Sequence, residues 1–176
     1  MRKLVILMGL VLLVAGAAVA QDTPKAEIFA GYSYIRARPG GGLSGFNNHG
    51  GSGSIALNVN RNFGLVADFG GYKVAGLPSG SSASIITYLF GPRISSRSNE
   101  KITPFVQGLF GGARLSGGGV STNGFSFAAG GGLDVKAAQH VAVRIAQFEY
   151  VYTRFSGVHF NNFRFSAGIV FRVGGK

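Results

Sequence analysis

The sequence lacks cysteine and tryptophan and holds only 6 Asp and Glu among its 176 residues. Without cysteine, disulfide scaffolds, cysteine-ligated zinc, iron–sulfur clusters and cysteine nucleophiles are excluded. The 17 Lys and Arg give a formal net charge of +11, yet only 13% of residues are charged and 46% are hydrophobic. That balance argues against a disordered chain. Glycine is abundant, with 30 residues, but follows no Gly-X-Y period, which excludes collagen.

The N-terminus has the three parts of a secretory signal peptide. Arg2 and Lys3 precede an apolar run over residues 4–20, which ends in the small-x-small motif Ala18-Val19-Ala20. A transmembrane helix is the alternative, but 17 residues lie at the bottom of the spanning range. We therefore predict a cleaved signal peptide over residues 1–20, a single mature domain over 21–176, and export from the cytoplasm.

After Pro24 the sequence alternates between apolar and small or polar residues, in runs of about ten that Gly, Ser and Asn clusters separate. We count eight such strand-like runs: 25–37, 50–60, 63–74, 83–94, 102–115, 124–136, 140–154 and 162–173. Connections 61–62, 95–101 and 137–139 are short and polar, whereas 38–49, 75–82, 116–123 and 155–161 are longer or rich in glycine. Outer-membrane barrels show this asymmetry between short turns and long loops.

The last run shows which face is apolar. Phe163, Phe165, Ala167, Ile169, Phe171 and Val173 alternate with Arg164, Ser166, Gly168, Val170 and Arg172. A soluble barrel such as a lipocalin hides its apolar face inside, whereas a membrane barrel turns that face to lipid. The opposite face is too small and polar for an apolar core. We therefore predict an all-β, eight-stranded antiparallel up-and-down transmembrane β-barrel, with the soluble barrel as the alternative.

The seventh run changes its alternation partway along. Val143 and Ile145 share one parity, and Phe148 and Tyr150 share the other. A single register would place Glu149 towards lipid, which is costly. We therefore predict a β-bulge near residues 146–147.

Aromatic and basic residues are expected at the edges of the membrane. Six tyrosines near strand ends are candidates for interfacial girdles: Tyr32, Tyr34, Tyr72, Tyr88, Tyr150 and Tyr152. Five basic residues are placed near the outer rim, where they suit anionic lipid headgroups: Arg36, Arg38, Lys73, Arg114 and Arg154. Ordinary strand packing and solvation are the alternative explanations. The basic residues do not cluster and no recognition motif accompanies them, so nucleic acid is not expected as a partner.

The inward positions predict a charge network in the lumen. Its expected members are four acids and four arginines, namely Glu27, Asp68, Asp134, Glu149, Arg93, Arg144, Arg164 and Arg172. Charges enclosed in a narrow barrel must pair. Because eight strands leave an interior that side chains can fill, we favour a plugged lumen over a gated ion path.

Catalysis and cofactor binding find little support. We expect His49 and His159 in loops on the same side, near Ser44, Ser52 and Ser156, with no acid to orient an imidazole. His140 lies in or beside a short turn. Three scattered histidines give no metal-ligand set, so no cofactor, metal or catalytic residue is predicted.

The C-terminal segment resembles the β-signal that the barrel assembly machinery recognises, through Ser166, Gly168, Phe171 and Val173, although Gly174-Gly175-Lys176 follow it. Together with Tyr88-Leu-Phe-Gly-Pro-Arg93, Pro104-Phe-Val-Gln107 and Gly131-Gly-Leu-Asp134-Val, the chain resembles the outer-membrane β-barrel domain family, often labelled porin-family proteins. It is similar in plan to the transmembrane domain of outer-membrane protein A.

That resemblance implies a monomeric protein of the Gram-negative cell outer membrane, with its long loops facing outward. It implies contacts with outer-membrane lipid and lipopolysaccharide, and with the assembly machinery during biogenesis; it identifies no loop ligand. A non-enzymatic structural or surface-interaction role is favoured. A narrow, low-conductance channel and a lipid-modifying enzyme are the alternatives.

Overall fold

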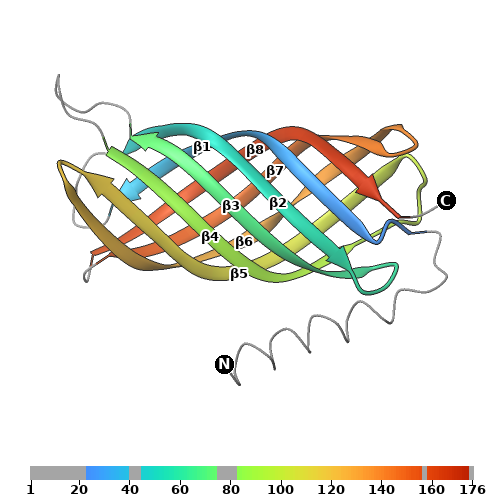
Figure 1. The fold of residues 1–176 in the computed structure, drawn as a ribbon, viewed down its shortest axis with the longest axis horizontal. Helices are drawn as coiled ribbons and strands as arrows, with labels where there is room; N and C mark the ends of the chain where they lie inside the picture. Colours follow the sequence, from blue (N-terminus) through green and yellow to red (C-terminus); the bar gives the residue numbers. More distant parts are fainter. Residues whose placement is uncertain (1–22, 40–44, 75–82, 156–157, 175–176) are drawn as a thin grey trace.

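The computed structural model describes residues 23–39, 45–74, 83–155 and 158–174 (Figure 1). The predicted signal peptide, Ser44 and Ser156 lie outside these ranges. Eight strands are present: β1(Ala26–Pro39), β2(Phe46–Asn58), β3(Phe63–Val74), β4(Ala83–Ser95), β5(Ile102–Gly117), β6(Val120–Ala138), β7(Val141–Phe155) and β8(Val158–Val173). Each pairs with the next in antiparallel fashion, and β1 pairs with β8 to close a barrel. The predicted all-β, eight-stranded antiparallel barrel is confirmed. No described segment forms a helix that is long and apolar enough to span a membrane.

The barrel has two distinct ends. At one end, here called the turn end, lie the β2–β3, β4–β5 and β6–β7 connections and both ends of the described chain, where the Lys25 amide donates to the Gly174 carbonyl at 2.7 Å. The opposite ends of the eight strands, where the Gly118–Gly119 turn joins β5 to β6, form the end here called the loop end (Figure 1). The connections at the turn end hold two to six residues, whereas those at the loop end include both the longest connection and two of only two residues.

The strands reach further towards the loop end than the sequence predicts. Strands β2, β6 and β8 begin at residues 46, 120 and 158, whereas the predicted starts are 50, 124 and 162. The added residues, 46–49, 120–123 and 158–161, are mostly polar, but they pair along neighbouring strands, and this pairing overrides their turn-like composition. The predicted loop over 116–123 is wrong: Gly118 and Gly119, with φ of 59° and 80°, form a two-residue hairpin turn.

The predicted faces are confirmed. On β8, Arg164 and Ser166 are 2% and 0% exposed, whereas Phe163 and Phe171 are about half exposed, at 52% and 49%. Large apolar side chains cover the outside of the barrel on every strand. This arrangement is the reverse of a soluble lipocalin-like barrel and matches a barrel whose outer wall meets lipid.

The predicted bulge in β7 is confirmed. On the β6 side Leu133 pairs with Ala146 and Asp134 with Arg144, so Ile145 has no partner. The β8 ladder also shifts register between Arg144 and Gln147. The extra residue changes the parity of the strand and turns Glu149 into the lumen.

The prediction is wrong for one of the six tyrosines that were assigned to the interfacial girdles. Tyr72 lies inside the barrel and is 2% exposed, whereas Tyr32, Tyr88 and Tyr150 are exposed on the outside. The inward position is open to a large ring because its neighbour is Gly70. A Cβ at Gly70 would lie only 2.5 Å from the Tyr72 hydroxyl.

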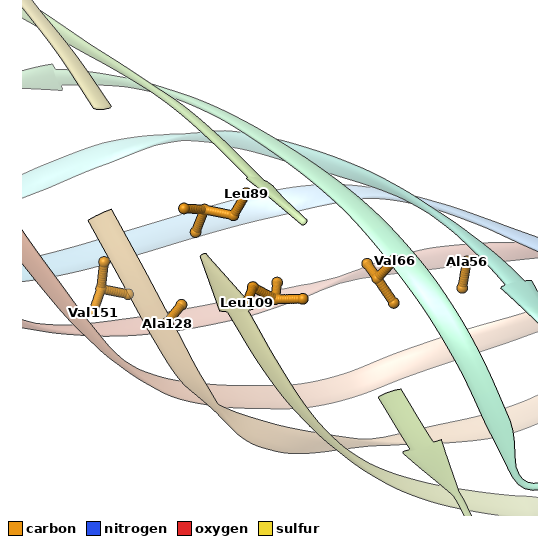
Figure 2. Close-up of a cluster of buried hydrophobic side chains, with 6 residues drawn as sticks. All are labelled: Ala56, Val66, Leu89, Leu109, Ala128 and Val151. Atoms are coloured by element: carbon orange, nitrogen blue, oxygen red, sulfur yellow. The ribbon is translucent and has the colours of Figure 1, made fainter. Parts of the chain in front are cut away.

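Part of the barrel interior is apolar. Ala56, Val66, Leu89, Leu109, Ala128 and Val151 form one cluster of buried side chains that runs along the inner wall (Figure 2). Several members are direct cross-strand partners, as Leu109 is of Ala128 and Ala128 is of Val151. Phe29, Ala142 and Val170 form a second buried apolar cluster, and polar side chains occupy many of the other inward positions.

Candidate functional site: the barrel lumen

All eight charged residues predicted for the lumen point inward. Glu27, Asp68, Arg93, Asp134, Arg144, Glu149 and Arg164 are at most 3% exposed, and the side chain of Arg172 is 11% exposed. They come from β1, β3, β4, β6, β7 and β8. The alternation of inward and outward side chains along each strand therefore directs these charges toward the barrel axis.

Arg164 joins two acids from different strands. Its guanidinium lies 2.7 Å from Asp68 Oδ1 and 2.6 Å from Glu149 Oε2. Its Nη1 also donates to the Tyr72 hydroxyl at 3.3 Å. Because Asp68 is on β3 and Glu149 on β7, Arg164 on β8 ties distant parts of the wall together.

Arg144 forms a bidentate ion pair with Asp134. Its Nε and Nη2 donate to the two carboxylate oxygens at 2.7 and 3.0 Å, the geometry that makes Arg–carboxylate pairs strong. The guanidinium also lies over the rings of Phe29 and Phe105, at 4.3 and 4.4 Å. Arg93 lies over the same Phe105 ring at 4.3 Å. Inward aromatic faces thus supplement the acids as partners of the arginines.

Two buried glutamines, which are not among the predicted lumen residues, connect the charged groups. Gln107 accepts hydrogen bonds from Arg93 and donates to Glu149 Oε1 at 2.9 Å. Gln147 accepts from Arg144 and donates to Glu149 Oε2 at 2.7 Å. The alternation of β5 and β7 places both glutamines on the inward face. The predicted network considered only charged side chains and therefore did not include these neutral amides. The glutamines make a single network of the separate pairs.

At the turn end, Glu27 gathers three arginines. Its carboxylate lies 3.1 Å from Arg97, 3.1 Å from Arg172 and 4.0 Å from Arg93. Arg97 belongs to the β4–β5 connection, within the short polar turn predicted over 95–101, and is not among the residues predicted for the lumen. In the described residues the network therefore holds four acids and five arginines, one cation more than expected.

The histidines are placed differently from the prediction. His49 and His159 lie in β2 and β8 rather than in loops, and both are exposed on the outer wall. His49 Nδ1 lies 2.5 Å from the Tyr32 hydroxyl. Ser52 faces the lumen, where it bonds Ser33, so the barrel wall separates it from His49. His140 lies in the β6–β7 turn, as expected.

Two other groups of predicted residues lie on the described strands, the rim cations and the β-signal-like segment. Arg36, Arg38, Lys73, Arg114 and Arg154 are exposed near the loop end. Ser166 and Gly168 of the β-signal-like segment face inward, whereas Phe171 and Val173 face outward, on the strand that closes the barrel. The described residues contain no group of three or more His, Cys, Asp or Glu arranged to hold a metal ion.

The fold is that of the small eight-stranded outer-membrane barrels. It is similar to Neisserial surface protein A (NspA), with a TM-score of 0.73 and 15% identity over 84% of this chain and 97% of that one. It is also similar to Ail, the attachment invasion locus protein of Yersinia pestis (TM-score 0.56, 20% identity, 85% and 99% covered). Outer membrane protein OprG of Pseudomonas aeruginosa gives a TM-score of 0.53 at 9% identity, with 87% and 97% covered. No family model and no curated protein matches the sequence.

Proposed function

We propose that this protein is a closed, non-enzymatic barrel of the Gram-negative outer membrane, with a structural or surface-interaction role at its loop end. The observation that carries the proposal is the network that spans the lumen. Hydrogen bonds and ion pairs connect Asp68 through Arg164, Glu149 and Gln107 to Arg93 and Glu27. These paired charges, buried in the middle of a narrow eight-stranded barrel, support a lumen that is closed to a continuous water path.

The location rests on the apolar outer wall and on the fold shared with NspA and Ail. In that setting the loop end faces outward, because outer-membrane barrels keep their short turns on the periplasmic side. The five exposed cations near the loop end would then meet lipopolysaccharide phosphates, and the β8 segment would be read by the assembly machinery. A gel comparing boiled and unboiled membrane fractions tests the location: a folded barrel migrates differently before boiling.

Planar-bilayer recordings of the refolded protein test the closed lumen. We expect no steady open events from the natural sequence. The double variant Glu149→Ala, Arg164→Ala removes two oppositely charged side chains that fill the lumen, and we expect it to conduct. A matched pair of rim substitutions, Arg36→Ala with Arg154→Ala, should leave the barrel closed. Steady openings of the unsubstituted protein would overturn the closed barrel in favour of a narrow channel.

A further inference from the structure

The turn end of the barrel, at the right in Figure 1, carries a group of cations that the charge network engages only in part. Each lies two residues beyond a buried inward residue: Lys25 beyond Glu27, Arg97 beyond Ser95, Lys101 beyond Thr103, Lys136 beyond Asp134 and Arg172 beyond Val170. Because side chains two residues apart in a strand share a face, the alternation places all five on the lumen side, at its mouth. They are called the mouth cations below.

Contacts within the barrel agree with this placement. The two arginines both contact the buried carboxylate of Glu27, at 3.1 Å. Lys136 pairs with Ala142 of β7, whose side chain is fully buried inside the barrel. Lys101 lies opposite Lys136 at the end of the β5–β6 ladder, where the Lys136 amide donates to the Lys101 carbonyl at 2.7 Å. The mouth cations therefore surround one opening.

The acids at this end do not balance the mouth cations. Glu27 is shared by three arginines. Asp134 is held by both prongs of Arg144, deeper in the lumen. Glu100 is exposed in the β4–β5 connection, and no ion pair joins it to a cation within the described ranges. The opening is therefore left with an excess of positive charge.

The three lysines are the accessible part of the group. Lys25, Lys101 and Lys136 are exposed, and in the part of the chain that the structure describes none of them forms an ion pair. Like charges opposite each other on paired strands are destabilising, yet two of these lysines are opposite. An anion between them offsets the repulsion, and Arg97 and Arg172 add to the positive potential at the mouth.

The convergence of several cations selects a ligand with more than one negative charge. Phosphate oxygens accept hydrogen bonds both from ammonium groups and from guanidinium groups, and a phosphate can carry two charges where a carboxylate carries one. The outward neighbours of the two opposed lysines, Ile102 and Val135, occupy the lipid side of the wall. The lysines lie on the other side, so the site is open to a soluble ligand.

We propose that the turn-end mouth of the lumen binds a water-soluble, phosphate-bearing anion. Its phosphate lies between the ammonium groups of Lys101 and Lys136. Lys25, Arg97 and Arg172 attract the ligand from around the opening. The site is at the opposite end of the barrel from the loops, so it is separate from the surface role proposed above.

Titration calorimetry with pyrophosphate tests the proposal, with the protein in phosphatidylcholine nanodiscs and empty nanodiscs as background. We expect saturable binding, weakened about tenfold or more in Lys101→Gln combined with Lys136→Gln, because two charge-assisted contacts are lost. Lys73→Gln combined with Arg154→Gln removes the same charge from exposed positions at the loop end and should leave the affinity within about twofold. The heat-modifiability gel checks that both double variants fold.

Three results would overturn the proposal. The first is the absence of saturable heat above that of empty nanodiscs. The second is equal weakening by the two double variants, which would mean that a basic protein attracts anions without a site. The third is retention of phosphatidylglycerol through purification, lost only in the turn-end variant and without pyrophosphate binding, which would assign the mouth cations to a lipid headgroup.

Discussion

Gln107 and Glu149 touch across a strand that lies between them. The Gln107 amide on β5 donates to Glu149 Oε1 on β7 at 2.9 Å, although β6 separates the two strands. The residue of β6 that pairs with both is Gly130. The lack of a side chain there allows the contact, and several predictions about the lumen depend on such close approaches.

Gly130→Ala should destabilise the barrel. A Cβ at this position would lie 2.6 Å from the Glu149 Cα and 2.8 Å from its Cγ, so either the backbone or the network must move. We expect a loss of about 1–3 kcal/mol in the free energy of unfolding, measured by urea titration in lipid vesicles. Gly108→Ala on β5 is the control, because nothing lies within 4 Å of its Cβ. Equal losses for the two variants would contradict the explanation.

Arg164→Met should cost about 3–5 kcal/mol, because it leaves Asp68 and Glu149 buried without their shared cation. The same titration measures the loss. Arg154→Met makes the same change on the exposed outer wall and should stay within about 0.5 kcal/mol. If Arg164→Met proves as mild as its control, the network does not contribute to stability in the way the contacts imply.

Single deletions in β7 should have opposite outcomes. Removing Ala146 leaves Arg144 inward, Ile145 outward and Gln147 inward in a regular ladder, so both halves of the strand keep their faces. We expect this variant to fold. Deleting Phe148, two residues along, forces either Gln147 or Glu149 towards lipid and should prevent folding. The heat-modifiability gel distinguishes the two results, and a folded Phe148 deletion would contradict the assigned faces.

The β5–β6 hairpin should be sensitive to side-chain branching at its tip. Gly118 has φ of 59°, where asparagine is tolerated and β-branched residues are strained. We expect Gly118→Val to lose about 1–2 kcal/mol and Gly118→Asn to lose little, by urea titration. The hairpin assignment is wrong if valine is tolerated as well as asparagine.

The rim cations should couple the barrel to anionic lipid. The five acids among the described residues are Glu27, Asp68, Glu100, Asp134 and Glu149. Four of them face the lumen and Glu100 lies in the β4–β5 connection at the turn end, so none of the five lies beside the exposed rim cations. Replacing Arg36, Arg38, Lys73, Arg114 and Arg154 with serine should lower the melting temperature in vesicles that contain lipopolysaccharide. In phosphatidylcholine vesicles we expect no change. An identical shift in both lipids would remove the evidence for headgroup contacts.

Alternation alone predicts the barrel and its faces, because the period of two is preserved from strand to strand. The break in that period between Ile145 and Phe148 is enough to place the bulge. The missed features depend on three-dimensional neighbours. Gln107 reaches Glu149 two strands away because Gly130 lies between them. Tyr72 lies inward beside Gly70, and Arg97 contacts Glu27 from a turn. The mouth cations come from the ends of five strands, which only closure of the barrel brings together.

Closure of the barrel has a consequence for the order of events during biogenesis. The β1–β8 ladder pairs Ala26 with Val173 and Pro39 with Phe160, so its partners stand at nearly opposite ends of the sequence. Such long-range pairing makes folding slow. A chain truncated before β8 would leave β1 and β7 as exposed strand edges. The chain must therefore be synthesised as far as β8 before its fold can be completed, and until then its unpaired strand edges can pair with other chains.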